Sequence, residues 1–175
     1  QGTAFVFALG ASVPVKLDET GQVTEIFDGI SVPANCTVAV SVDQLQVLER
    51  ASVFLTHCGM NSCSESVSKR VPVVAVPFFG DQIHNAERFE ELGCGIVRRY
   101  SQGYHGAFAW NPDYSQITEF SLASAIGSVL NDPSYSAAIE ALCDEISEEC
   151  GAPIQEKIAD ILKFADSARH GGIFA

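Results

Sequence analysis

The stretch "SVFLTHCGMNSCSESVSKRVPVVAVPFFGDQIHNAERFEELGCGIV", residues 52–97, decides the fold. Short apolar runs alternate in it with longer segments whose apolar residues recur at helical spacing. The pattern predicts strands over 52–56, 71–77 and 95–99 and helices over 61–69 and 81–93. Strands that are apolar on both faces and are followed by helices form a parallel sheet that is covered on both sides. The sequence therefore predicts an α/β fold with a Rossmann-like parallel sheet.

The flanking sequence predicts further elements of the same kind. We expect strands over 4–10 and 36–40, helices over 43–50 and 121–130, a helix that starts at Asp132 and Pro133, and a final helix from Pro153. The final helix carries an apolar stripe that must be buried, made of Ile154, Ile158, Ile161, Leu162 and Ala165. Residues 11–35 and 100–114 contain several glycines and little periodicity, so we expect mostly loop there.

The composition is that of a globular domain. The 175 residues are 47% hydrophobic and 18% charged, enough to build one domain with a real core. The formal net charge of −12 argues against a nucleic-acid-binding surface, which needs a basic face. The acids gather in "EALCDEISEECG", residues 140–151, which we interpret as a solvated helix face.

The sequence contains no recognisable membrane helix or signal peptide. No run reaches the roughly 18 consecutive apolar residues that a membrane helix needs, and no basic leader precedes the apolar start. We expect a cytoplasmic location, with membrane association only through parts of the protein outside this sequence. Because the sequence begins without Met, we interpret it as part of a longer chain.

The six cysteines include no C-x-x-C pair, so we expect reduced thiols and no metal. A zinc site at Cys58 and Cys63 beside His57, or disulfides, are the alternatives.

The turn "HCGMNS", residues 57–62, joins a predicted strand to a predicted helix at the sheet edge where ligands bind in such folds. A helix start offers unpaired backbone N–H groups and partial positive charge, which suit a phosphate group. Gly59 permits close approach of the backbone to a ligand, and Asn61 and Ser62 add short polar side chains. Glu65 shares a helix face with Asn61 and can accept hydrogen bonds from hydroxyl groups. The turn is therefore predicted to bind a nucleotide diphosphate.

Four ordered motifs resemble the donor-binding signature of the UDP-glycosyltransferases of the two-domain GT-B type. They are "DQLQVL" (43–48), "THCGMNSCSE" (56–65), "VPVVAVPFFGDQIHNA" (71–86) and "ELGCGI" (91–96). The similarity covers residues 41–97, about a third of the chain. It implies a partial nucleotide-sugar-binding domain over 1–168, a tail over 169–175, and an acceptor-binding N-terminal domain outside this sequence.

The resemblance also implies a role for each matched residue in binding a nucleotide sugar, expected to be a UDP-sugar. These roles are contact with the diphosphate (His57, Gly59, the backbone of Met60, Asn61, Ser62), the ribose hydroxyls (Glu65), the sugar (Asp81, Gln82) and the base (Val42, Gln44). No cofactor or metal is implied beyond the donor substrate.

Each role has a structural alternative. His57 can be a buried histidine that is satisfied by backbone groups, and Glu65 can be an ordinary surface acid. Asn61 and Asp81 can simply cap helices, which would not prevent ligand binding.

The sequence departs from the family at two positions. Ser41 stands where the family usually has an aromatic residue that stacks on the base, which puts base affinity and choice in doubt. Arg70 stands where the family favours glycine at a helix end. If that backbone is left-handed, arginine is strained there because its Cβ approaches the following carbonyl.

The family transfers sugar by direct displacement, with a base, commonly histidine, in the acceptor domain, so we expect no catalytic residue in this chain. His84 and His105 are read as structural or surface residues. The first strand of the family's donor domain lies mid-sheet and is not recognised here, so the sheet would be split.

We expect the donor-binding part of a glycosyltransferase that transfers sugar to a hydroxyl of a small-molecule or lipid acceptor. A non-catalytic nucleotide-sugar-binding module, or pseudoenzyme, is the alternative. An NAD-binding domain is disfavoured because no G-x-G-x-x-G follows an early strand.

Overall fold

The structure is a computed structural model that describes residues 3–9, 13–26, 29–99, 115 and 117–150. Its centre is a three-stranded parallel sheet in the order β6 (Phe54–Thr56), β7 (Val73–Ala75) and β8 (Gly95–Val97). The three residues of β7 are fully buried. Gly95 lets β8 lie close to β7, because a Cβ at that position would come within 2.3 Å of the Val73 carbonyl oxygen.

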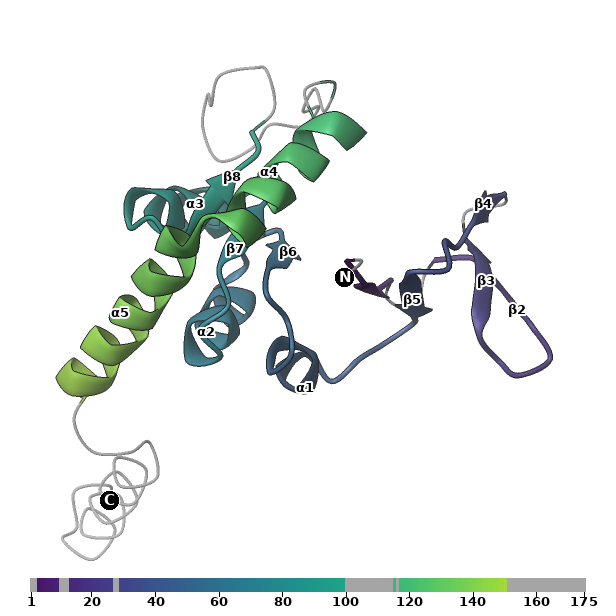
Figure 1. Cartoon of the computed structure of the whole chain (residues 1–175), viewed down its shortest axis with the longest axis horizontal. Helices are drawn as coiled ribbons and strands as arrows, with labels where there is room; N and C mark the ends of the chain where they lie inside the picture. Colours follow the sequence, from purple (N-terminus) through teal and green to yellow (C-terminus); the bar gives the residue numbers. More distant parts are fainter. Residues whose placement is uncertain (1–2, 10–12, 27–28, 100–114, 116, 151–175) are drawn as a thin grey trace, which may run out of the picture.

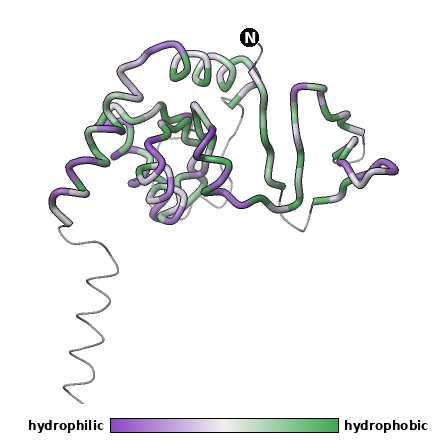
Figure 2. The backbone as a smooth tube through the Cα atoms, turned by 60° about the horizontal axis from the view of Figure 1, so that its bottom comes forward, coloured by the Kyte–Doolittle hydropathy of each residue, from purple (hydrophilic) through white to green (hydrophobic). Residues whose placement is uncertain are grey.

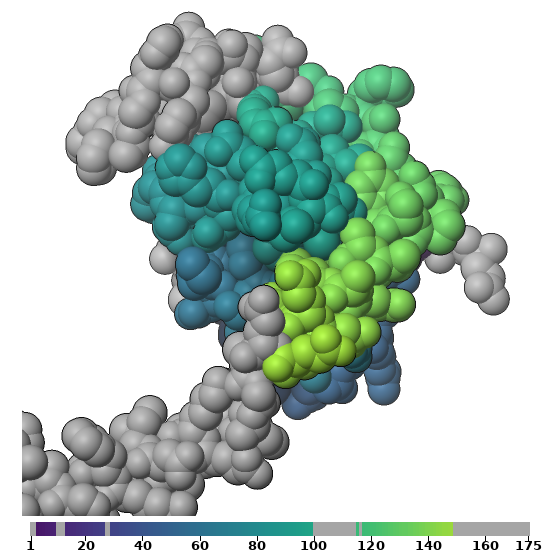
Figure 3. Space-filling model, turned by 90° about the vertical axis from the view of Figure 1, so that its left-hand side faces the viewer, coloured from purple at the N-terminus to yellow at the C-terminus, as the bar shows by residue number. Residues whose placement is uncertain are grey.

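Helices cover both faces of this sheet (Figure 1). Val73 and Ala75 point to one face, where they share a core with residues of α2 (Met60–Ser68), α3 (Asp81–Glu91) and α5 (Pro133–Cys150). Val74 points to the other face and packs against Ala125 and Val129 of α4 (Glu119–Asn131). In Figure 3 the teal surface of the central part of the chain lies beside the green surface of α4 and α5. This alternation along β7 confirms the predicted sheet with helices on both sides.

The N-terminal strands form a separate parallel pair, β1 (Phe5–Ala8) with β5 (Cys36–Ala39). The short helix α1 (Gln44–Leu48) connects this pair to β6, and Figure 1 shows the two parallel sheets apart from each other. Hydrophobic segments run through both parts (green in Figure 2). In the described part of the chain the parallel strands are thus split between two sheets, as the resemblance implied.

A small antiparallel sheet corrects the expectation that residues 11–35 are mostly loop. It comprises β2 (Val15–Leu17), β3 (Val23–Ile26) and β4 (Ile30–Ser31). The turn between β2 and β3 is closed by Asp18, whose Oδ1 accepts hydrogen bonds from the Thr20 hydroxyl and from the backbone N–H of Gln22. These bonds lower the pKa of Asp18. The strands are too short, and too interrupted by turn residues, for a periodicity of two to be visible.

The ends of the helices explain two sequence signals. Gly93 has φ +70° and its N–H donates to Glu90 at 3.0 Å, which confirms the predicted glycine at the end of α3. Arg70 has φ +56°, so the left-handed position at the end of α2 is occupied by a non-glycine residue. Its guanidinium donates to Asp144 of α5 at 2.5 Å, which joins the two helices at this point.

The other helices match their predicted positions to within a few residues. Thr118 caps α4, and its side chain and that of Ser121 exchange hydrogen bonds with each other's backbone N–H. The predicted stripe from Ile154 to Ala165, the aromatic segment over 100–114 and His105 lie outside the described residues. No helix among the described residues is long and apolar enough to cross a membrane.

Candidate functional site

The loops that follow β6 and β7 end at the same edge of the sheet, because the two strands are parallel and adjacent. The first loop, residues 57–59, leads into α2, and the second, residues 76–80, leads into α3. The two helix starts therefore lie at the carboxyl end of the sheet, where the sequence predicted a ligand.

Cys58 gives the first loop its shape. It is fully buried and has φ +60°, an uncommon conformation for a residue with a side chain. Its N–H donates to the Thr56 hydroxyl at 3.2 Å, and its carbonyl accepts from Asn85 Nδ2 of α3 at 3.0 Å. The turn after β6 is thus held from both sides by side chains of neighbouring elements.

Gly59 is the N-cap of α2 and leaves room for the ring of His57. A Cβ at Gly59 would lie 2.7 Å from His57 Nε2, closer than real Cβ atoms approach. Since the φ of Gly59 is −63°, an added side chain would conflict with the present position of the ring and not with the backbone conformation. His57 itself is exposed. The interpretation of His57 as a buried histidine is therefore wrong.

The start of α2 presents several backbone donors. The first bond of the helix runs from Cys63 N–H to the Gly59 carbonyl, so the N–H groups of Met60, Asn61 and Ser62 have no acceptor within the helix. No side chain caps this end. Asn61 is the second residue of the helix and exposed, so it is not the cap.

Glu65 lies one turn along α2 and is half-buried. Its Oε2 accepts a hydrogen bond from Gln44 Nε2 of α1 at 2.5 Å, so Glu65 is not an isolated surface acid. Gln44 therefore lies beside Glu65, and Val42 is half-buried just before α1. Ser41 is exposed.

The second loop contains Gly80, which has φ +65° and is the N-cap of α3. Asp81 is exposed in the first turn, where its charge suits the helix dipole, so it is not the cap. Its Oδ2 accepts from Asn85 Nδ2 at 3.2 Å. Gln82 is buried, and its Oε1 accepts from the backbone N–H groups of Phe78 and Phe79. Gln82 thus closes the loop whose end carries Asp81.

Two residues that the sequence reasoning missed hold the site together. Thr56 and Asn85 bond to Cys58 from β6 and α3. The available signal for Asn85 was its spacing: it lies four residues after Asp81 on the same helix, so it faces the site. Nothing in the sequence signalled the left-handed backbone of Cys58.

The cysteines near the site are unbridged. The five cysteines whose side chains are described are free thiols, namely Cys36, Cys58, Cys63, Cys94 and Cys143. A hydrogen bond with Cys63 and burial raise the pKa of Cys58, and burial raises the pKa of Cys94. Among the described residues, no group of three or more His, Cys, Asp or Glu side chains is placed to hold a metal ion.

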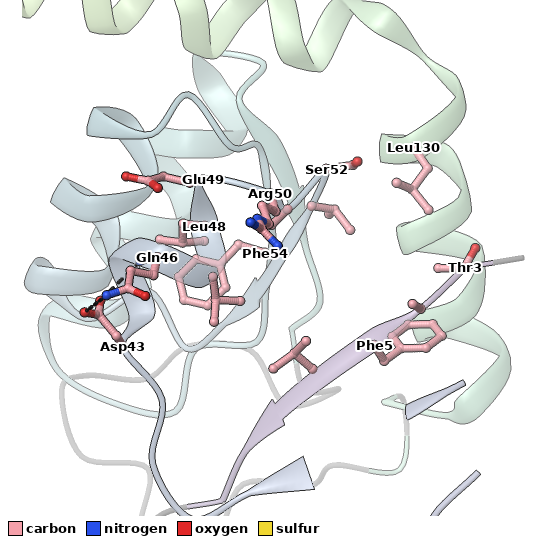
Figure 4. A pocket seen from close by; sticks show the side chains of 15 residues that line it. Thr3, Phe5, Asp43, Gln46, Leu48, Glu49, Arg50, Ser52, Phe54 and Leu130 are labelled. Atoms are coloured by element: carbon pink, nitrogen blue, oxygen red, sulfur yellow. Dashed lines mark hydrogen bonds between the residues drawn. The ribbon is translucent and has the colours of Figure 1, made fainter. Parts of the chain in front are cut away.

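A cavity of about 920 Å³ lies elsewhere, between the two parallel sheets (Figure 4). Its lining comes from residues 3–6 with β1, from residues 43 and 46–54 between α1 and β6, and from Leu130 of α4. The helix α1 forms part of this lining, but Gln44, His57 and Glu65 are not among the lining residues. The predicted donor residues are therefore not part of this cavity.

Comparison with known proteins identifies the family of this chain. Residues 34–149 match the family model described as UDP-glucoronosyl and UDP-glucosyl transferase. The ecdysteroid UDP-glucosyltransferase of Lymantria dispar multicapsid nuclear polyhedrosis virus is 32% identical over 133 residues, which make up 75% of this chain and 24% of that protein. The NDP-glycosyltransferase YjiC of Bacillus subtilis (strain 168) is 33% identical over 121 residues, 69% of this chain and 27% of that protein.

Solved structures agree with this match. The glycotransferase of kitacinnamycin has a TM-score of 0.61 and 29% identity over 82% of this chain and 31% of its own. The spinosyn forosaminyltransferase SpnP has a TM-score of 0.64 over 94% of this chain and 44% of its own, and its 18% identity makes this a likeness of fold. This confirms the predicted GT-B type of α/β fold.

The sequence spans about a quarter of the length of the two curated relatives. The family match nevertheless covers more than half of this chain and includes both loops of the site. The chain belongs to the UDP-glucoronosyl and UDP-glucosyl transferase family.

Proposed function

We propose that this chain is the donor-binding part of a glycosyltransferase that takes a sugar from a nucleotide diphosphate sugar, in the first instance a UDP-sugar. One observation carries the proposal. The start of α2, with its unpaired N–H groups, lies beside the exposed ring of His57 and one turn before Glu65. In a nucleotide diphosphate sugar the ribose is joined directly to the diphosphate, which fits a phosphate site at the start of α2 with a carboxylate one turn further along.

The diphosphate would bind at the start of α2. Backbone N–H groups and the positive end of the helix dipole favour a phosphate there without further charge. His57 would donate from its ring, and Ser62 from its hydroxyl. Because these groups can share the charge of the diphosphate, we propose that binding requires no metal.

The ribose and the sugar would lie on either side of the diphosphate. Glu65 Oε1 would accept from ribose hydroxyls while Oε2 stays bonded to Gln44. Asp81, exposed at the start of α3, would accept from sugar hydroxyls. Gln82 already uses its Oε1 within the loop, which leaves its amide N–H groups for the sugar. Val42 and Ser41 would lie near the base.

Transfer itself needs an acceptor hydroxyl and a base in line with the sugar, a positioning effect that supplies several kcal/mol of the barrier. We propose that both come from an acceptor-binding domain outside this sequence, with a hydroxyl of a small molecule or lipid as acceptor. Among similar folds, VinC was solved with DTDP and SpnG with thymidine diphosphate and with spinosyn aglycone. These ligands support a nucleoside diphosphate as the group to test first.

The test is calorimetric titration of the 175-residue chain with UDP, dTDP and UDP-glucose. His57→Ala and Ser62→Ala are each expected to lower the affinity for UDP by roughly tenfold, the value of a hydrogen bond to a charged group. Ser64→Ala is the matched control, because its hydroxyl donates to the Met60 carbonyl of its own helix at 3.0 Å. Equal affinities in all four proteins would refute the proposed site. A chain that binds none of the three ligands would refute the function.

A further inference from the structure

We propose that Asn85 is a positioning residue that couples the phosphate side of the donor site to its sugar side. The inference rests on the proposed function and goes beyond it, because Asn85 is assigned no contact with the donor. It concerns how the loop after β6 and the start of α3 are kept in one arrangement.

Asn85 serves both loops with one amide group. It is half-buried in the second turn of α3, and its Nδ2 donates to the Cys58 carbonyl at 3.0 Å and to Asp81 Oδ2 at 3.2 Å. An amide nitrogen has two N–H donors, and this side chain uses both of them in hydrogen bonds within the protein. One bond reaches the loop before α2, and the other fixes the carboxylate at the start of α3.

The bond to Cys58 opposes backbone strain. A non-glycine residue at φ +60° brings its Cβ close to the following carbonyl, and such a residue persists only where its surroundings hold it. Cys58 is held by Thr56 at its N–H and by Asn85 at its carbonyl. Without Asn85 the carbonyl of this fully buried residue loses its partner, and the loop gains by rotating toward an ordinary conformation.

Rotation at Cys58 would move the phosphate site, because its two neighbours are His57 and Gly59. His57 Nε2 lies only 2.7 Å from where a Cβ of Gly59 would be, so a small change of the backbone alters both the ring and the start of α2. The bond to Asp81 acts separately: its loss frees the carboxylate that would meet the sugar and leaves the helix start unchanged.

The two effects can be separated by a double-mutant cycle. Asn85→Ala is expected to lower the affinity for UDP by roughly tenfold. In a Cys58→Gly background the same substitution is expected to cost less than about threefold, because glycine adopts positive φ without strain. In both backgrounds Asn85→Ala should also reduce the ratio of UDP-glucose affinity to UDP affinity, since Asp81 loses its partner. Arg88→Ala, on the exposed side of α3, is the matched control and should change neither ligand's affinity.

The measurement is calorimetry on the 175-residue chain, with thermal melting as the check on folding. An equal loss of UDP affinity in both backgrounds, or no loss in either, would overturn the role of Asn85 while leaving the proposed function intact. Failure of the unsubstituted chain to bind UDP would instead overturn the proposed function and with it this inference. If Asn85→Ala does not fold, Asn85→Leu gives the same comparison, because it keeps about the side chain's size, carries no charge and has no donor for Cys58 or Asp81.

Discussion

Gln44 of α1 donates a hydrogen bond from Nε2 to Oε2 of Glu65 on α2, at 2.5 Å. The two residues are 21 positions apart in sequence, and both are half-buried. The bond fixes one oxygen of the Glu65 carboxylate and thereby orients the other. Gln44, which the resemblance placed beside the base, is thus in contact with the residue proposed for the ribose.

This bond gives the first prediction. Gln44→Ala should lower the affinity for UDP by roughly tenfold, because Glu65 loses a charge-assisted hydrogen bond and its fixed orientation. Gln44→Glu should be more damaging, since it places two carboxylates at hydrogen-bonding distance. Calorimetry with UDP measures both, with Gln46→Ala as a control on the same helix, whose side chain bonds to Asp43 instead. A Gln44→Glu variant that binds UDP as tightly as the unsubstituted chain would show that Gln44 plays no part in the ribose site.

Gly59 gives a second prediction. Gly59→Ala should weaken UDP binding about as much as His57→Ala does, because the new Cβ would lie 2.7 Å from His57 Nε2 and displace the ring. In a His57→Ala background the same change should have little further effect, since the ring that it displaces is gone. Gly127→Ala is the matched control: it lies inside α4, and among the described residues no atom beyond its chain neighbours and its own helix backbone lies within 4 Å of its Cβ position. It should leave affinity unchanged and raise the unfolding free energy by up to about 1 kcal/mol. Additive losses in the double variant would show that Gly59 acts through something other than His57.

Substitution of Asp81 tests sugar binding separately from nucleotide binding. Asp81→Asn should reduce binding of UDP-glucose by several-fold and spare UDP, because the exposed carboxylate at the start of α3 is proposed for sugar hydroxyls and not for phosphate. Gln82→Ala should also lower the melting temperature, since it removes the acceptor for the N–H groups of Phe78 and Phe79. Calorimetric affinities of Asp81→Asn for UDP-glucose and for UDP check the first expectation, and thermal melting of Gln82→Ala checks the second. Equal losses for both ligands in Asp81→Asn would assign Asp81 a purely structural role.

Arg70 provides a test of stability away from the ligand. Arg70→Gly should raise the melting temperature, because glycine adopts φ +56° without the strain that an arginine Cβ introduces. The ion pair with Asp144 is lost in this variant, but both side chains are largely exposed, so its contribution is small. Asp144→Ala removes the ion pair alone and should change the melting temperature little. A melting temperature for Arg70→Gly at or below that of Asp144→Ala would show that glycine relieves no strain at this position, because the ion pair is lost in both variants.

The sequence predicted the features that follow from local rules. The alternation of apolar runs with helical spacing located β6, β7, β8 and the helices between them, and Gly93 marked a helix end correctly. The doubt about Arg70 also anticipated its left-handed backbone. These features depend on neighbours in sequence, so they can be read from a single chain.

Features that depend on contacts between elements, or on the direction of a side chain, were not predicted. The small sheet β2–β3–β4 has strands of two to four residues, too short for a period to show. The role of Asn85 depends on the Cys58 carbonyl, 27 positions away. Gly59 was expected to make room for a ligand, and the structure shows that its missing Cβ makes room for His57. The first two cases depend on contacts between elements, and the third on the direction of the His57 ring within one loop.

Binding of a diphosphate at the start of α2 can be observed by amide NMR of the labelled 175-residue chain during titration with UDP. We expect the backbone N–H resonances of Met60, Asn61 and Ser62 to shift most, in step with that of Gly59, because their unpaired N–H groups gain a charged acceptor. Shifts confined to residues that line the cavity between β1 and β6, such as Phe5, Ser52 and Phe54, would contradict this expectation.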